Sequence, residues 1–113
     1  MKASVLIPTP TFIGAFDYPT AARLPDGPGC YVLTNAGFDI LYLGQAVSLK
    51  SRVLQHLEAG RHRELTSYGR ASLLSIFEIE DPLRLSPHER GWLNQCVLAD
   101  GTLPPLNKVE API

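Results

Sequence analysis

The sequence predicts a single small domain of mixed α and β structure, and three observations support this class. Two apolar, β-rich segments, residues 30–33 and 38–43, flank a short Asn-Ala-Gly segment that is typical of a hairpin turn. Residues 48–59 and 86–99 have the composition and spacing of helices, and another β-rich segment, residues 72–79, lies between them. The length of 113 residues is that of one domain, and 45% hydrophobic residues exclude disordered, collagen and coiled-coil classes.

The first 28 residues contain five of the ten prolines, which predicts a proline-rich extension packed on the core rather than a helix. Within it, residues 5–7 and 12–16 are apolar enough to form edge strands or extended cover. The leading apolar segment ends at Pro8 and is too short for a signal peptide, and no segment reaches the ~18 apolar residues of a membrane span. We therefore expect no membrane association.

The two cysteines, Cys30 and Cys96, lie in apolar segments and lack the paired spacing of a zinc site. Two thiols are also too few for a disulfide scaffold. We expect both to be reduced core residues, which is typical of a reducing compartment, and we expect the protein to be cytoplasmic.

The predicted hairpin brings two tyrosines together. If Ala36 and Gly37 form a two-residue loop, Tyr31 lies opposite Tyr42 on one face of the sheet, whereas a bulge would offset them. Each tyrosine alone is compatible with an ordinary half-buried strand aromatic. Gly44, at the junction of strand and helix, allows a backbone or a substrate to come close.

The first predicted helix, residues 48–59, ends before Gly60, a typical C-terminal cap. Its residues Arg52 and His56 are four apart and therefore lie on one stripe of the helix. Two interpretations stay open. The pair belongs to a solvated helix face, or it provides a cation for an anionic substrate with a proton-transfer group beside it.

The second predicted helix, residues 86–99, contains a carboxylate with two possible roles. Ser86 and Glu89 have the spacing of a capping box, in which the glutamate side chain bonds the N-cap backbone N–H. Glu89 also shares the helix face of Trp92 and Cys96, which points it toward the apolar side. Because an inward carboxylate is costly without a partner, this direction favours a functional site.

The net charge of −1 is unevenly distributed. Residues 45–70 carry five basic and two acidic residues, a balance of +3, whereas the rest carries five basic and nine acidic residues, a balance of −4. The near-neutral total excludes a strongly basic nucleic-acid arm. The basic segment predicts modest, salt-sensitive affinity for nucleic acid through one face. Its candidate contacts are Lys50, Arg61, Arg63 and Arg70.

Taken in order, the notable residues are Gly29-Cys30-Tyr31, Tyr42-Leu43-Gly44, Arg52, His56, Glu89 and Asn107. This ordered set resembles the GIY-YIG nuclease family, with cysteine and leucine in place of the two isoleucines. The resemblance covers residues 29–108 and leaves residues 109–113 as a short tail. One departure is Gln45, where the family often has a basic residue; we include Gln45 among the candidate nucleic-acid contacts. Another is the absence of a separate DNA-recognition domain.

The resemblance implies a small α/β (α+β) fold, with a three-stranded antiparallel sheet flanked by helices. It implies an endonuclease that uses one divalent cation, Mg²⁺ or Mn²⁺, to hydrolyse phosphodiester bonds of nucleic acid. DNA is the expected substrate. Glu89 would be the metal ligand, Arg52 would neutralise the scissile phosphate, Tyr31 or Tyr42 would position or deprotonate the attacking water, and His56 would assist proton transfer. Gly29, Gly44 and Asn107 would support the site.

Two alternatives to the nuclease remain. One is a non-catalytic module on the same scaffold that binds nucleic acid or protein. The other is an accessory subunit whose residues 1–28 dock on a larger protein. For the nuclease itself, we expect a protein partner or self-association to supply substrate specificity.

Overall fold

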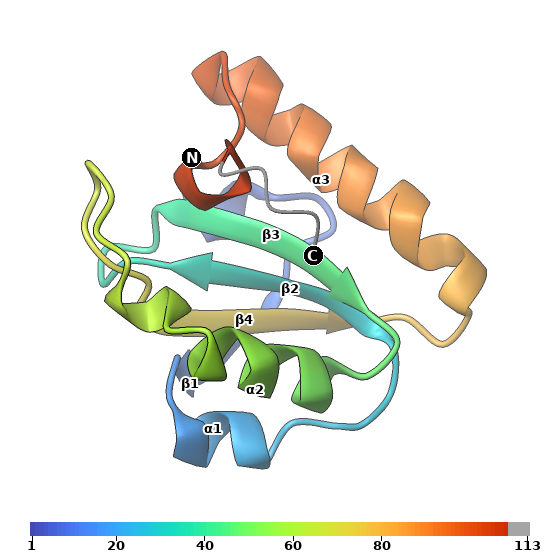
Figure 1. The fold of residues 1–113 in the computed structure, drawn as a ribbon. Helices are drawn as coiled ribbons and strands as arrows, with labels where there is room; N and C mark the ends of the chain where they lie inside the picture. The colour runs from blue at the N-terminus through green and yellow to red at the C-terminus, as the bar shows by residue number, and fades with distance from the viewer. Residues whose placement is uncertain (109–113) are drawn as a thin grey trace.

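The computed structural model describes residues 1–108 and confirms the predicted α+β class, with one antiparallel sheet and helices on both faces (Figure 1). The sheet order is β1-β4-β2-β3. The strands are β1 (Thr11–Ala15), β2 (Gly29–Thr34), β3 (Ile40–Ala46) and β4 (Leu73–Glu78). The helices are α1 (Tyr18–Ala22), α2 (Leu49–Glu58) and α3 (Leu85–Asp100), with short 3₁₀ helices at Ala3–Val5, Arg61–Arg63, Pro82–Arg84 and Pro105–Lys108. The predicted tail, residues 109–113, lies outside the described residues.

The sheet has four strands, one more than the three that the family resemblance implied. The added strand is β1, which pairs antiparallel with β4 and has a bulge between Phe12 and Gly14. The edge strand expected at residues 12–16 is thus confirmed, whereas residues 5–7 form no strand. Pro8 and Pro10 precede β1, so neither removes an N–H from the ladder. The proline-rich extension therefore adds the fourth strand to the sheet. The expectation that this extension contains no helix is wrong, because α1 (Tyr18–Ala22) forms within it. Pro19 lies in the first turn of α1, where its missing N–H costs nothing, and the Asp17 side chain caps the helix by accepting from the backbone N–H of Thr20.

The hairpin of β2 and β3 exists, but its predicted register is wrong. Tyr31 lies opposite Gly44, and Leu33 opposite Tyr42, with an irregularity after Leu33. The reason is the turn, which is longer than two residues. The Asn35 backbone N–H donates to the carbonyl of Asp39, and the Asn35 side-chain oxygen accepts from two backbone N–H groups in the turn. This network offsets the strands by two residues, so the tyrosines are diagonal neighbours rather than partners.

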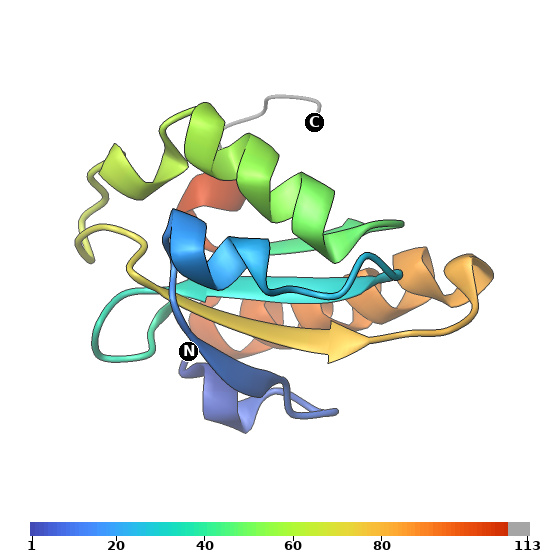
Figure 2. The ribbon, with the colours of Figure 1, turned by 90° about the horizontal axis from the view of Figure 1, so that it is seen from below.

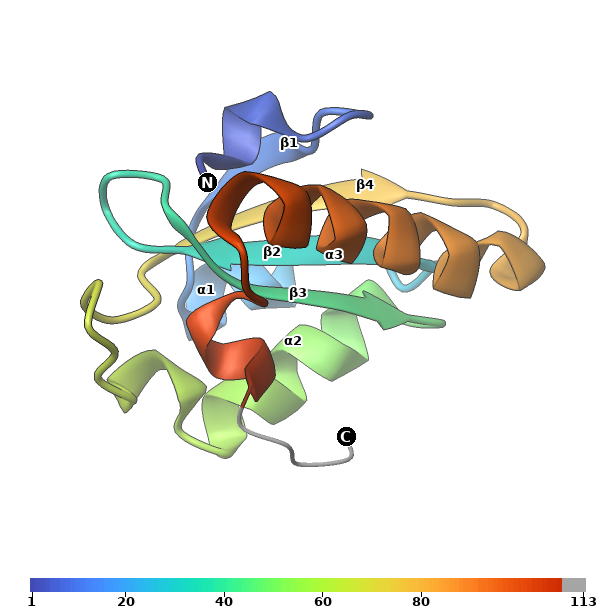
Figure 3. The ribbon, with the colours of Figure 1, turned by 90° about the horizontal axis from the view of Figure 1, so that it is seen from above.

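Helices cover the two faces of the sheet separately. Figure 2 shows α1 and α2 on one face and α3 on the other, and Figure 3 shows α3 lying over the sheet, along β2. Side chains of β2 alternate between the two sides because a strand has a period of two. Tyr31 and Leu33 belong to the core under α1 and α2, whereas Cys30 and Val32 belong to the core under α3. β2 is therefore buried on both faces.

The predicted helices are confirmed, with one correction at the start of the second. The Ser48 hydroxyl caps α2 by accepting from the backbone of Ser51, and Gly60 follows the helix with φ of 79°. α3 begins at Leu85, directly after a 3₁₀ turn that the Asp81 side chain caps. The N-cap position of α3 is thus Arg84, and the predicted Ser86–Glu89 capping box does not form.

Both cysteines are free and buried, as the sequence predicts. Burial raises the pKa of the Cys30 thiol to about 12 and that of the Cys96 thiol to about 11. Both lie in the core between the sheet and α3. Among residues 1–108, no helix has the length and hydropathy needed to span a membrane.

Candidate active site

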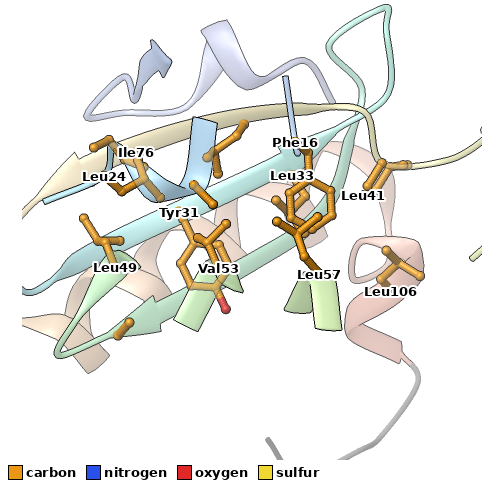
Figure 4. Close-up of a cluster of buried hydrophobic side chains, with 14 residues drawn as sticks. Phe16, Leu24, Tyr31, Leu33, Leu41, Leu49, Val53, Leu57, Ile76 and Leu106 are labelled. Carbon is orange, nitrogen blue, oxygen red and sulfur yellow. The ribbon is translucent and has the colours of Figure 1, made fainter. Parts of the chain in front are cut away.

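The site begins where Tyr31 of β2 crosses Gly44 of β3. A Cβ on Gly44 would lie 2.5 Å from the Tyr31 hydroxyl oxygen, so only glycine leaves space for the ring. Figure 4 shows Tyr31 beside Leu49 and Val53 of α2, and its side chain is 1% exposed. The Tyr42 ring is tilted against it at 6.0 Å between centroids. The two tyrosines therefore share a face, as predicted, despite the shifted register.

Gly29 has a similar packing role at the start of β2. A Cβ there would lie 2.7 Å from the carbonyl oxygen of Phe77 and 2.8 Å from a methyl group of Leu49. Its lack of a side chain allows β4 and the first turn of α2 to approach β2 together. This close approach brings α2 over the tyrosine pair.

Helix α2 supplies a histidine to the tyrosines. The Nε2 atom of His56 lies 2.6 Å from the hydroxyl oxygen of Tyr31, and the His56 ring is also 5.1 Å from that of Tyr42 between centroids. His56 is only 3% exposed. Burial, with the positive charges of Arg61 and Arg52 nearby, lowers the pKa of His56 to about 4. His56 is therefore neutral at pH 7, and the unprotonated nitrogen of a neutral imidazole can accept a hydrogen bond from a phenol.

Burial also changes the tyrosines. It raises the pKa of Tyr31 well above 10, and the neighbouring Tyr42 adds to this rise. The pKa of Tyr42 is raised as well, again chiefly by burial. Both phenols are therefore protonated at neutral pH, and either one needs a proton acceptor beside it to remove a proton from water.

Helix α3 supplies the carboxylate from the far side of the sheet. Glu89 is half-buried, and its Oε1 accepts a hydrogen bond of 2.9 Å from the side-chain amide of Gln45 on β3. The same amide nitrogen lies 3.0 Å from the hydroxyl oxygen of Ser86. Of the two roles predicted for Glu89, helix capping and an inward-facing carboxylate, the structure has the second.

These side chains line one open cleft of about 330 Å³ at the end of β3. Its lining combines phenols, a carboxylate, an amide, a guanidinium and apolar side chains. The residues are Tyr31, Tyr42, Gln45, Ala46, Val47, Arg52, Leu85 and Glu89. Arg52 also lines a smaller adjoining cavity with Ser48, Ser51 and Gln55 along α2. A positive and a negative group thus face one space, an arrangement suited to an anionic substrate with a bound cation.

Asn107 supports the site from the C-terminal side. Its side-chain oxygen accepts from the backbone N–H of Leu43, and its amide donates to the carbonyl of Leu43, both at 2.9 Å. Because β3 is an edge strand, this pair of bonds satisfies backbone groups that no neighbouring strand reaches. Asn107 therefore fixes β3 two residues before the cleft residue Gln45.

The predicted nucleic-acid contacts are not equivalent. Arg63 and Arg70 are exposed, and Lys50 is half-buried. Arg61 differs, because it is 7% exposed, pairs with Glu64 at 3.3 Å and has its guanidinium 6.0 Å from the centre of the Tyr42 ring. Its charge acts on the tyrosine and histidine of the site.

The sequence did not single out several cleft residues. Val47 and Leu85 form apolar walls of the cleft. Ser86, which was expected to cap the helix, contacts the amide of the cleft residue Gln45 instead. Apolar side chains of this kind have no sequence signal that separates a cleft wall from a core. The Ser86 contact follows only once the start of α3 is known.

No family model matches the chain. Part of the chain is similar to UvrABC system protein C. A stretch of 57 residues, 50% of the chain, is 44% identical to this protein from Symbiobacterium thermophilum, and 55 residues are 34% identical to that from Alkaliphilus metalliredigens. A shorter stretch of 38 residues is 47% identical to the protein from Limosilactobacillus fermentum. The matched parts are 9%, 9% and 6% of these proteins, so the chain spans less than a tenth of any of these three UvrABC system protein C chains.

Proposed function

We propose that this chain is a metal-dependent endonuclease of GIY-YIG type that hydrolyses phosphodiester bonds in nucleic acid, with DNA as the first substrate to test. The observation that carries the proposal is the convergence of Tyr31, Tyr42, Arg52 and Glu89 on one cleft, with His56 bonded to Tyr31. The similarity of 57 residues, 50% of this chain, to UvrABC system protein C from Symbiobacterium thermophilum supports the proposal.

The cleft suits one hydrated divalent cation, Mg²⁺ or Mn²⁺. Within residues 1–108 there is no cluster of three or more His, Cys, Asp or Glu side chains that could enclose a metal ion. Glu89 is the carboxylate among the cleft residues, and its Oε2 has no hydrogen-bond partner among the described residues. Mg²⁺ often keeps several waters and binds through one or two carboxylates, so this donor set fits. A cation bound there supplies positive charge that stabilises the developing phosphate charge.

Arg52 has the second electrostatic role. Its guanidinium lines both the main cleft and the adjoining cavity, so a phosphate in the cleft lies within its reach. A guanidinium stays charged at any working pH and binds phosphate oxygens through two parallel hydrogen bonds. Arg52 orients the scissile phosphate and offsets the charge that accumulates on its oxygens during attack.

The Tyr31–His56 pair accepts the proton from water. Because Tyr31 stays protonated, it cannot act as a base alone, and the neutral His56 at 2.6 Å takes the phenolic proton. Tyr31 receives a proton from the attacking water as it passes its own to His56, so the phenol ends the step neutral and His56 ends it charged. Tyr42 positions the water beside Tyr31.

The test is a cleavage panel with plasmid, branched and single-stranded DNA, each with Mg²⁺, Mn²⁺ or EDTA, at low and moderate salt. We expect cleavage by the wild type only with metal, and a loss of at least about 100-fold in Glu89→Gln and in Arg52→Ala. Glu80→Gln, a change of the same type at an exposed position, is expected to leave the rate within twofold. Absence of cleavage in every condition, or equal rates for the wild type and Glu89→Gln, refutes the nuclease and favours the binding module.

Under the same proposal, this protein is cytoplasmic, and its selection of substrate depends on a protein partner or on self-association. The exposed Arg63 and Arg70 and the half-buried Lys50 give general phosphate affinity. Phosphate contacts position nucleic acid without reading its sequence. Selectivity therefore requires a surface beyond this segment.

A further inference from the structure

Gln45 connects β3 to α3 at the edge of the cleft. Its side-chain nitrogen lies 2.9 Å from the Oε1 of Glu89 and 3.0 Å from the hydroxyl oxygen of Ser86. The Ser86 hydroxyl lies 3.4 Å from the Gln45 side-chain oxygen. A glutamine amide has two hydrogens to donate. Both hydrogens are therefore used in hydrogen bonds within the protein, one to Ser86 and one to Glu89.

The orientation of this amide is determined by its neighbours. If the amide were flipped, its oxygen would lie against the Glu89 carboxylate, where two acceptors would repel each other. Ser86 and Glu89 are three residues apart on α3 and therefore lie on the same helix face. Gln45 thus forms hydrogen bonds to two residues on one face of α3, Ser86 and Glu89, and fixes the Glu89 side chain in one position relative to β3.

We propose that Gln45 is a positioning residue for the metal-binding carboxylate, an inference that rests on the proposed function. By donating to Oε1, it leaves Oε2 of Glu89 for the cation. Because the amide is neutral, it holds the carboxylate without cancelling its charge. This role replaces the phosphate contact expected for Gln45, since its two N–H groups are already in use.

The experiment measures Mn²⁺ binding to the full chain without nucleic acid, by electron paramagnetic resonance of the free ion. Gln45→Leu removes both hydrogen bonds and is expected to weaken Mn²⁺ binding by about tenfold, the usual effect of losing a partner that orients a metal ligand. Ser86→Ala is expected to give a smaller loss in the same direction. Glu89→Gln is expected to abolish binding at this site.

The matched control is Gln95→Leu. Gln95 also lies on α3 and makes two hydrogen bonds, to the backbone N–H and carbonyl of Ile7, on the N-terminal segment. Its loss affects stability in a comparable way but leaves Glu89 untouched, so Mn²⁺ affinity is expected to stay within twofold. Urea midpoints of both variants verify that each is folded during the titration.

The outcomes separate the two proposals. If Glu89→Gln abolishes Mn²⁺ binding but Gln45→Leu binds as the wild type does, the positioning role is wrong and the proposed metal site stands. If Glu89→Gln leaves binding unchanged, the metal site itself is wrong, and the positioning role fails with it. As a second readout, Gln45→Leu is expected to raise the Mn²⁺ concentration for half-maximal cleavage about tenfold, with the rate at saturating metal within twofold of the wild type.

Discussion

The buried His56 makes the free energy of unfolding fall as the pH is lowered. The pKa of His56 falls from its ordinary value of 6.5 to about 4 in the folded protein, because of burial and of the nearby Arg61 and Arg52. Unfolding exposes the ring and returns its pKa to the ordinary value. Between these two pKa values, the unfolded chain binds a proton that the folded chain excludes. Stability from this group is therefore complete above about pH 6.5 and is lost as the pH falls toward 4.

The magnitude follows from the difference between the two pKa values. A difference of about 2.5 corresponds to about 3 kcal/mol when fully expressed. At pH 5.0, this effect has already lowered the free energy of unfolding by about 2 kcal/mol relative to pH 7.5. This is a large share of the ~5–15 kcal/mol that stabilises a typical domain.

The assay compares urea denaturation of the wild type and of His56→Gln at pH 7.5 and 5.0. The glutamine does not titrate, and its side-chain oxygen can still accept from Tyr31. Carboxylates and the other histidines titrate in both proteins, so their contributions cancel. The wild type is expected to lose about 2 kcal/mol more than the variant on acidification. Equal losses, or a His56 NMR titration midpoint near 6.5, would contradict the reasoning.

Three further predictions concern packing and charge. Gly44→Ala forces a methyl group into the ring of Tyr31 opposite it and is expected to cost about 1–3 kcal/mol in urea denaturation. The control is Gly91→Ala, at an exposed helical position with nothing within 4 Å, which is expected to be neutral or stabilising. Equal effects of the two substitutions would refute the close approach of Tyr31 to Gly44. Asn107→Ala removes the two hydrogen bonds between the Asn107 side chain and the backbone of Leu43. It is expected to cost about 1–3 kcal/mol, with faster amide exchange in β3 as its local signature. Replacing Arg63 and Arg70 by alanine is expected to flatten the slope of log binding constant against log salt by about one for each lost phosphate contact; an unchanged slope would remove them from the interface.

The hairpin shows how far the sequence alone reaches. Both strands and the shared face of the tyrosines were predicted, because apolar alternation and turn residues are local signals. The predicted register was wrong, because the register depends on the turn network around Asn35 and on Phe38, a non-glycine residue with φ of 67°. The tyrosines kept their common face because the offset is two residues rather than one, and strand faces repeat every two residues.

Glu89 shows the opposite case, in which one local signal misled and another succeeded. The Ser86–Glu89 spacing indicates a capping box, but Asp81 and the 3₁₀ turn after it start the helical segment earlier and leave Ser86 inside α3. The shared face of Glu89, Trp92 and Cys96 predicted the inward direction correctly, because helical periodicity persists whatever the first residue is. The partner of the carboxylate, Gln45, was beyond local patterns, since 44 positions separate the two residues.

Under the proposed function, the basic segment, residues 45–70, lets a chain of net charge −1 bind an anionic substrate. Its five basic residues divide by location rather than acting as one patch. Arg61 is turned inward onto Tyr42 and Glu64, where its charge helps to keep His56 neutral. Arg52 lines the cleft, and the remaining three lie outside it. These charges keep the His56 ring unprotonated but also lower its basicity. Under the proposed mechanism, an anionic phosphate bound beside Arg52 offsets the positive charges and makes the imidazole a better proton acceptor.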